Sequence, residues 1–91
     1  MVRNDDERVL FNEIARDLLT AHGAVLKGEA LWRALGFGSR SAFQRAVAAR
    51  TVGVTLFPMR EGRGRYALTR DVARYLAKLR IDAERRVGEP Q

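Results

Sequence analysis

The sequence contains no cysteine and a single histidine, His22. Disulfides and zinc sites built on thiolates are therefore excluded, and any other metal site would lack its usual nitrogen ligands. His22 has no neighbouring serine or acid arrangement that identifies a nucleophile and its orienting partner, and it fits better near the end of a helix, beside exposed carbonyls. We expect no metal, no cofactor and no enzymatic activity.

Long hydrophobic runs are also missing, since no apolar stretch approaches the roughly 20 residues that a membrane helix needs. Met1 and Val2 are followed by polar and acidic residues, which match neither a secretory signal nor a basic transit peptide. These absences predict a soluble, cytoplasmic protein. The glycine patterns of nucleotide sites are absent too: Gly36 and Gly38 lack the third glycine and the preceding strand of a dinucleotide fold, and no phosphate-binding loop motif occurs.

Lysine is scarce, because only Lys27 and Lys78 contribute to the 17 basic residues of the 91-residue chain. The positive charge is concentrated in residues 33–65, which hold seven arginines and one acid, whereas residues 1–23 carry a net charge of −2. Arginine's planar fork suits bidentate contacts to phosphate and guanine. The distribution favours one polyanion-facing side, although arginine-rich codon usage and an ordinary solvated surface would leave a similar pattern.

Hydrophobic periodicity and glycine positions predict one domain of α+β class, mainly α. The first helix is expected from Asn4–Asp6 to Ala21, with Gly23 ending it. The short apolar run at 24–26 fits either a strand or a linker. The remaining expectations are a helix over 28–35, a glycine turn over 36–38, a helix over 40–50, β-prone runs over 54–59 and 65–69 that form a hairpin, a helix over 70–86 capped by Thr69, and a disordered tail over 87–91.

The helix expected over 40–50 has a polar outer side. Ser39 and Ser41 both suit a helix cap, and Ser41 with Gln44 matches the capping-box pattern. Helical spacing assigns Phe43, Ala46 and Val47 to the core. The side chains left to face outward are Arg40, Ser41, Gln44 and Arg45, all of which can reach phosphates or base edges.

The hairpin expected over 54–69 carries arginines at or beside a glycine-containing tip, namely Arg60, Arg63 and Arg65. Such a tip is poorly suited to burial and well suited to crossing a phosphate backbone or entering a minor groove. Pro58 cannot donate to a β-ladder, which favours an edge or a bulge near the tip. An ordinary solvated turn is the alternative.

Together, these segments resemble the winged helix-turn-helix domains of MerR-like and excisionase-type, or AlpA-like, DNA-binding proteins. The resemblance spans about residues 25–80 and is most specific from Gly64 to Leu76, where a glycine, an arginine and an aromatic strand precede a capped helix with Asp71-Val72. The run from Leu31 to Phe37 is similar to the family's first helix and turn.

The resemblance implies that the helix over 40–50 enters the major groove and that the hairpin lies on the backbone or minor groove. The DNA-binding residues that it implies are Ser39, Arg40, Ser41, Gln44, Arg45, Arg60, Arg63 and Arg65. The expected function is that of a small transcriptional regulator or excisionase-like architectural factor of a mobile element, acting on double-stranded DNA and associated with the nucleoid when bound. The chain lacks the long C-terminal coiled coil of full MerR-type regulators, so no small-molecule effector is expected.

Minimal excisionases lack a helix like that over 1–23. Its apolar side could pack against the last helix of the same chain, or both terminal helices could zip with those of a second copy; we expect a homodimer. Residues 24–86 are expected to form the winged helix-turn-helix with its C-terminal helix. The rival function is a winged-helix module for protein interaction without DNA specificity, docking through the acidic first helix and Trp32. RNA binding is weaker, because most aromatic residues lie at core spacing.

Overall fold

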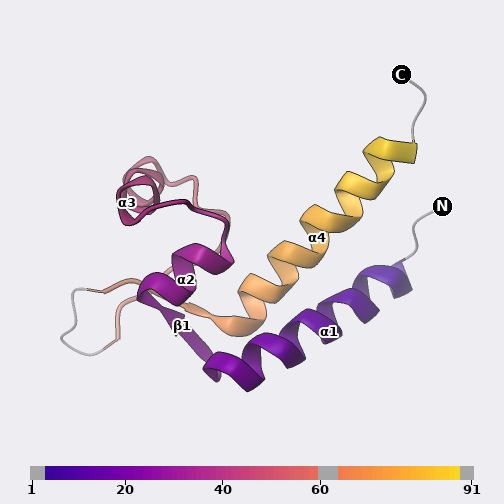
Figure 1. Cartoon of the computed structure of the whole chain (residues 1–91), viewed down its shortest axis with the longest axis horizontal. Coiled ribbons are helices and arrows are strands. Elements are labelled where there is room, and N and C mark those ends of the chain that lie inside the picture. Colours follow the sequence, from indigo (N-terminus) through magenta and orange to yellow (C-terminus); the bar gives the residue numbers. More distant parts are fainter. Residues whose placement is uncertain (1–3, 60–63, 89–91) are drawn as a thin grey trace.

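The computed structural model describes residues 4–59 and 64–88. In these residues it is mainly helical with a small antiparallel sheet, which confirms the expected α+β, mainly α, class. The elements follow the order α1 (Asn4–His22), β1 (Val25–Lys27), α2 (Gly28–Ala34), α3 (Arg40–Ala49), β2 (Tyr66–Leu68) and α4 (Thr69–Gly88). Figure 1 shows α1 and α4 side by side, with α2 and α3 near the end of the pair where α1 stops and α4 starts.

The pair formed by α1 and α4 is the largest helix contact in the fold, and the chain makes it within one subunit. Acidic residues in the first turn of α1 favour its start, and Gly23, with φ 80°, ends it. Small side chains at Ala15, Ala73 and Ala77 are buried and allow the helices to approach closely. The first helix was expected to pack against the last helix of the same chain or against a second copy. The structure shows the first of these contacts.

The start of α4 is tied to the end of α1 by Thr69. We predicted that Thr69 caps α4, but its hydroxyl instead donates to the carbonyl oxygen of Gly23 at 2.6 Å, and its backbone N–H donates to Ala24 at 2.9 Å. The side chain is fully buried, so its hydroxyl needs a partner inside the protein. At its other end α4 continues through Val87 and Gly88, beyond the helix end expected at residue 86, and the rest of the expected tail lies outside the described residues.

The sheet pairs β1 with β2, in the register Val25 with Leu68, Leu26 with Ala67 and Lys27 with Tyr66. The run at 24–26, predicted as a strand or a linker, therefore supplies a strand. The expected hairpin over 54–69 is less regular than predicted, because in its described residues a single antiparallel bridge joins Phe57 to Tyr66. Two backbone hydrogen bonds of 2.9 and 3.0 Å make this bridge, and Pro58, which follows Phe57, cannot donate another.

The core lies where the sheet, α2, α3 and the start of α4 meet. It is formed by Leu26, Leu31, Phe43, Val52, Ala67 and Val72. Phe43 is buried as predicted, and the rings of Phe37 and Phe43 meet edge to face, with centroids 5.6 Å apart. Because Phe43 fixes the inner side of α3, the opposite side of that helix is held toward solvent.

Candidate nucleic-acid interface

The start of α3 is fixed by Ser39, one of the residues predicted to bind DNA. Its backbone is extended, with φ −158°, and its hydroxyl oxygen accepts a hydrogen bond from the N–H of Ala42 at 3.1 Å. Ser39 is thus the N-cap, which is the first of the two caps that the sequence offered. The capping box of Ser41 with Gln44 is wrong, because the helix is already under way at Ser41.

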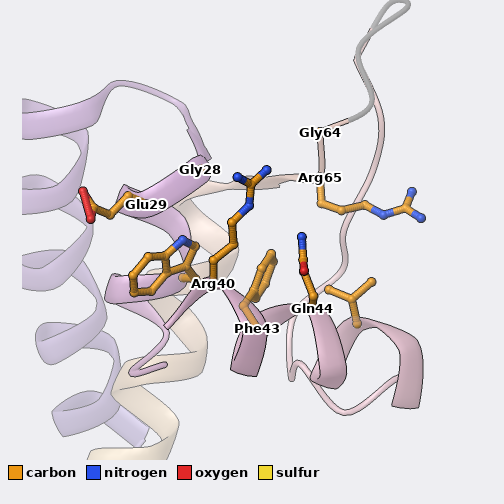
Figure 2. A pocket seen from close by; sticks show the side chains of 9 residues that line it. Gly28, Glu29, Arg40, Phe43, Gln44, Gly64 and Arg65 are labelled. Carbon is orange, nitrogen blue, oxygen red and sulfur yellow. The ribbon is translucent and has the colours of Figure 1, made fainter. Parts of the chain in front are cut away.

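A groove runs between α2, α3 and the residues that precede β2. It has a volume of about 600 Å³ and brings together three predicted DNA-binding residues: Arg40 and Gln44 from α3, and Arg65. Figure 2 shows Arg40 and Gln44 rising from α3 toward the segment that carries Gly64 and Arg65. Arg40 and Arg65 lie far apart in the sequence, so the groove exists only in the folded chain.

The wall of this groove is apolar where α2 and α3 pack together. Trp32, Phe43 and Val47 supply this part, and Glu29 is the acid at the groove. The Glu29 carboxylate lies 3.0 Å from the Arg33 guanidinium, one helical turn away, so its charge is matched locally. The guanidinium of Arg33 also lies over the Trp32 ring, 5.4 Å from its centroid. The two groove arginines therefore set the sign of the local charge.

The other predicted residues lie elsewhere. Ser41 and Arg45 are exposed on α3 but do not line the groove, because their positions on the helix turn them away from Arg40 and Gln44. The small Ala48 is exposed on the same outer side. Arg60 and Arg63 fall outside the described residues. Of the predicted residues, Ser39 thus caps α3, Arg40 and Gln44 line the groove with Arg65, and Ser41 and Arg45 lie on the outer side of α3.

The end of α3 adds a residue that sequence reasoning missed. The N–H of Arg50 donates to Val47 at 3.1 Å and that of Thr51 donates to Ala46 at 2.9 Å, which is the Schellman pattern. Arg50 holds the left-handed position, with φ 60° and ψ 40°, where glycine is usual. It lines a second, smaller groove together with Arg65. Helical spacing puts Arg50 in line with Phe43 and Val47, and no local signal marks the change in backbone direction.

Among residues 4–59 and 64–88, no three His, Cys, Asp or Glu side chains are grouped so that they could hold a metal ion. Within the same ranges, no helix combines the length and hydrophobicity needed to cross a membrane.

Comparison with known proteins gives no direct assignment. No protein-family model, curated protein or solved structure matches the chain significantly. The function has to be inferred from the residues that the fold brings together.

Proposed function

We propose that the chain is a sequence-specific double-stranded DNA-binding protein of the winged helix-turn-helix type. Its role would be that of a small transcriptional regulator or an excisionase-like architectural factor, in the cytoplasm and at the nucleoid when bound. In this proposal α3 enters the major groove, and the segment over 54–69 is the wing on the backbone or minor groove.

The observation that carries the proposal is that Arg40, Gln44 and Arg65 line one groove, although the Arg65 side chain extends away from the other two (Figure 2). Arginine donates to phosphate oxygens and to guanine, and glutamine pairs with adenine. Glu29, the acid at the groove, is already paired with Arg33 at 3.0 Å, so it does not cancel the charge of the arginines. Such a surface attracts a polyanion.

The exposed outer side of α3 supports the same function. Ser41 and Arg45 offer one neutral and one cationic group to a surface in front of the helix, and the small, exposed Ala48 in the turn after Arg45 leaves room for close approach. A helix that is anchored by Phe43 on its inner side keeps these groups in a fixed direction. Rigid presentation is what direct readout of base edges requires.

The proposal is tested with alanine variants of α3 on a duplex selected by the protein from a random pool. Arg40→Ala, Gln44→Ala and Arg45→Ala should each weaken binding to the selected site by about 1 to 3 kcal/mol, because each removes a contact to base edges or to the adjoining phosphates. Arg16→Ala is the matched control for loss of an arginine, since Arg16 is exposed on α1 and distant in sequence from α3. It should bind as the parent does.

Equal affinity of the parent and all three α3 variants would show that α3 does not read the duplex. Absence of any duplex shift at low salt, together with specific capture of a protein partner through Trp32 and α1, would favour the protein-interaction module instead. Fluorescence anisotropy at several salt concentrations measures both the affinity and its electrostatic part.

A further inference from the structure

The pair of α1 and α4 has an apolar stripe that the chain only partly covers. On α4, apolar side chains recur every three or four residues at Val72, Leu76, Leu79, Ala83 and Val87, which places them on one side of the helix. Val72 is fully buried and Leu76 packs against the core, whereas Leu79 is 48% and Val87 84% exposed. The stripe thus begins in the core and ends in solvent.

A matching stripe runs along α1. Leu18 packs against the core, and Ile14 and Leu10 follow one and two helical turns earlier, both half-buried. Because the two helices are antiparallel, this stripe leaves the core in the same direction as that of α4. Figure 1 shows that the first part of α1 and the last part of α4 extend beyond α2 and α3. We call Leu10, Ile14, Leu79, Ala83 and Val87 the open face.

The two helices that carry the open face have opposite charges. With His22 neutral, α1 holds five acids and two arginines, a net charge of −3, while α4 holds six basic residues and three acids, a net charge of +3. The ion pairs of Asp5 with Arg8, of Asp71 with Arg74 and of Glu84 with Arg80 each stay within one helix. Because the two helices carry net charges of opposite sign, a second copy can set its basic helix beside the acidic helix of the first.

We propose that the open face is covered by a second copy of this chain, related by a two-fold axis. A two-fold axis brings the same patch of both copies together, so each contact occurs twice. The dimer buries Leu79 and Val87 against the open face of the other copy. It also sets the acidic helix of each copy near the basic helix of the other. The assembly is formed by the terminal helices, so it does not depend on the DNA-binding function.

The molar mass of the full chain without DNA tests the proposal. Sedimentation equilibrium over micromolar to millimolar concentrations should approach twice the 10.3 kDa of one chain. Leu79→Asp and Val87→Asp should each raise the dimer dissociation constant at least tenfold, because each puts two charges into the apolar contact. Val9→Asp is the matched control: Val9 is 50% exposed but lies on a different side of α1 from Ile14, so this variant should dimerise as the parent does.

Two outcomes overturn the proposal. One is a parent protein that stays at the mass of a single chain throughout, and the other is loss of the dimer in Val9→Asp to the same extent as in Leu79→Asp. Circular dichroism establishes that each variant is folded, and Val87→Asp serves as the independent variant because its mostly exposed side chain contributes little to the monomer fold.

Charge reversal separates the electrostatic part of the contact. Arg86 lies beside the open face and Arg85 points to another side of α4, although both are exposed arginines in the last turns. Arg86→Glu should raise the dissociation constant by about tenfold. The reason is that each exposed attraction between Arg86 and the acidic α1 of the other copy is modest, and the two-fold axis makes it occur twice. Arg85→Glu should change the logarithm of the dimer dissociation constant by less than half as much as Arg86→Glu does. Equal effects would contradict the placement of the interface.

Discussion

Arg50 occupies a backbone conformation in which a side chain with a Cβ costs about 1 kcal/mol relative to glycine. The position ends α3 and turns the chain toward Val52, which is buried in the core. An arginine placed there sacrifices stability but contributes a cation to the smaller groove that Arg65 also lines. The two effects can be measured separately.

Arg50→Gly should stabilise the fold by about 0.5 to 1 kcal/mol and weaken duplex binding. Urea denaturation measures the first effect and anisotropy the second. Arg45→Gly is the matched control, because the same exchange inside α3 should destabilise the protein by about 1 kcal/mol. A loss of stability in Arg50→Gly as large as that in Arg45→Gly would show that the left-handed position carries no strain.

Gly53 lies under the ring of Tyr75, and its φ is 99°. A Cβ built at this glycine would lie 2.6 Å from two ring carbons of Tyr75, closer than such atoms approach in real proteins. The contact holds the chain after α3 against α4. Gly36 has a similar φ of 91°, but nothing lies within 4 Å of the corresponding Cβ. A substitution at Gly36 therefore measures the cost of the backbone angle without a steric clash.

Gly53→Ala should therefore destabilise the protein by about 1 to 3 kcal/mol more than Gly36→Ala, because it adds overpacking to the backbone strain. Thermal unfolding followed by circular dichroism provides the comparison. Equal losses in the two variants would mean that Tyr75 moves aside without cost.

At the scale of the elements, the joint between α1, β1, β2 and α4 depends on the Thr69 hydroxyl. Thr69→Val keeps the shape of the side chain but leaves the Gly23 carbonyl without its 2.6 Å donor. We expect a loss of about 1 to 3 kcal/mol in the free energy of unfolding, measured by urea denaturation. Thr69→Ser retains the hydroxyl and should lose less; a larger loss in the serine variant would mean that the methyl group, not the hydrogen bond, stabilises the joint.

The helices could be predicted from the sequence because their apolar side chains recur at helical spacing and capping residues or glycines mark their ends. The four helices in the described part of the chain lie within a few residues of the predicted ranges. The strand pairing could not be predicted in full: the two β-prone runs around residues 60–64 are neighbours in sequence and favour a local hairpin, whereas β2 pairs along its length with β1, about 40 residues away. Leu26 and Ala67 drive this pairing because both are buried at its centre.

The candidate site was only partly predictable for a similar reason. Helical spacing correctly set Phe43 inward and so fixed which residues of α3 face outward. It could not show that Arg40 and Gln44 share a groove with Arg65, because this depends on how the segment before β2 is held in space. Nor could it choose between Ser39 and Ser41 as the cap, since both satisfy the local pattern.

At the scale of the whole molecule, the acidic α1 and the arginine-rich groove lie on different elements of an elongated protein, with extents of 48 × 29 × 18 Å. The arrangement separates the proposed DNA-binding surface from the terminal helices. Arg65→Ala should weaken all duplexes alike and reduce the slope of log affinity against log salt by about 0.9, the effect of one phosphate contact. A change confined to one preferred sequence would instead assign Arg65 to base readout.

Selection from a random duplex pool at near-physiological salt, followed by sequencing of the bound fraction, measures whether this protein reads DNA sequence. The proposed role of α3 predicts enrichment of one short consensus, and loss of that consensus when the pool is selected with Arg45→Ala. Binding of the unselected pool with no enriched sequence, or no retention of duplex at all, would contradict sequence-specific recognition by α3.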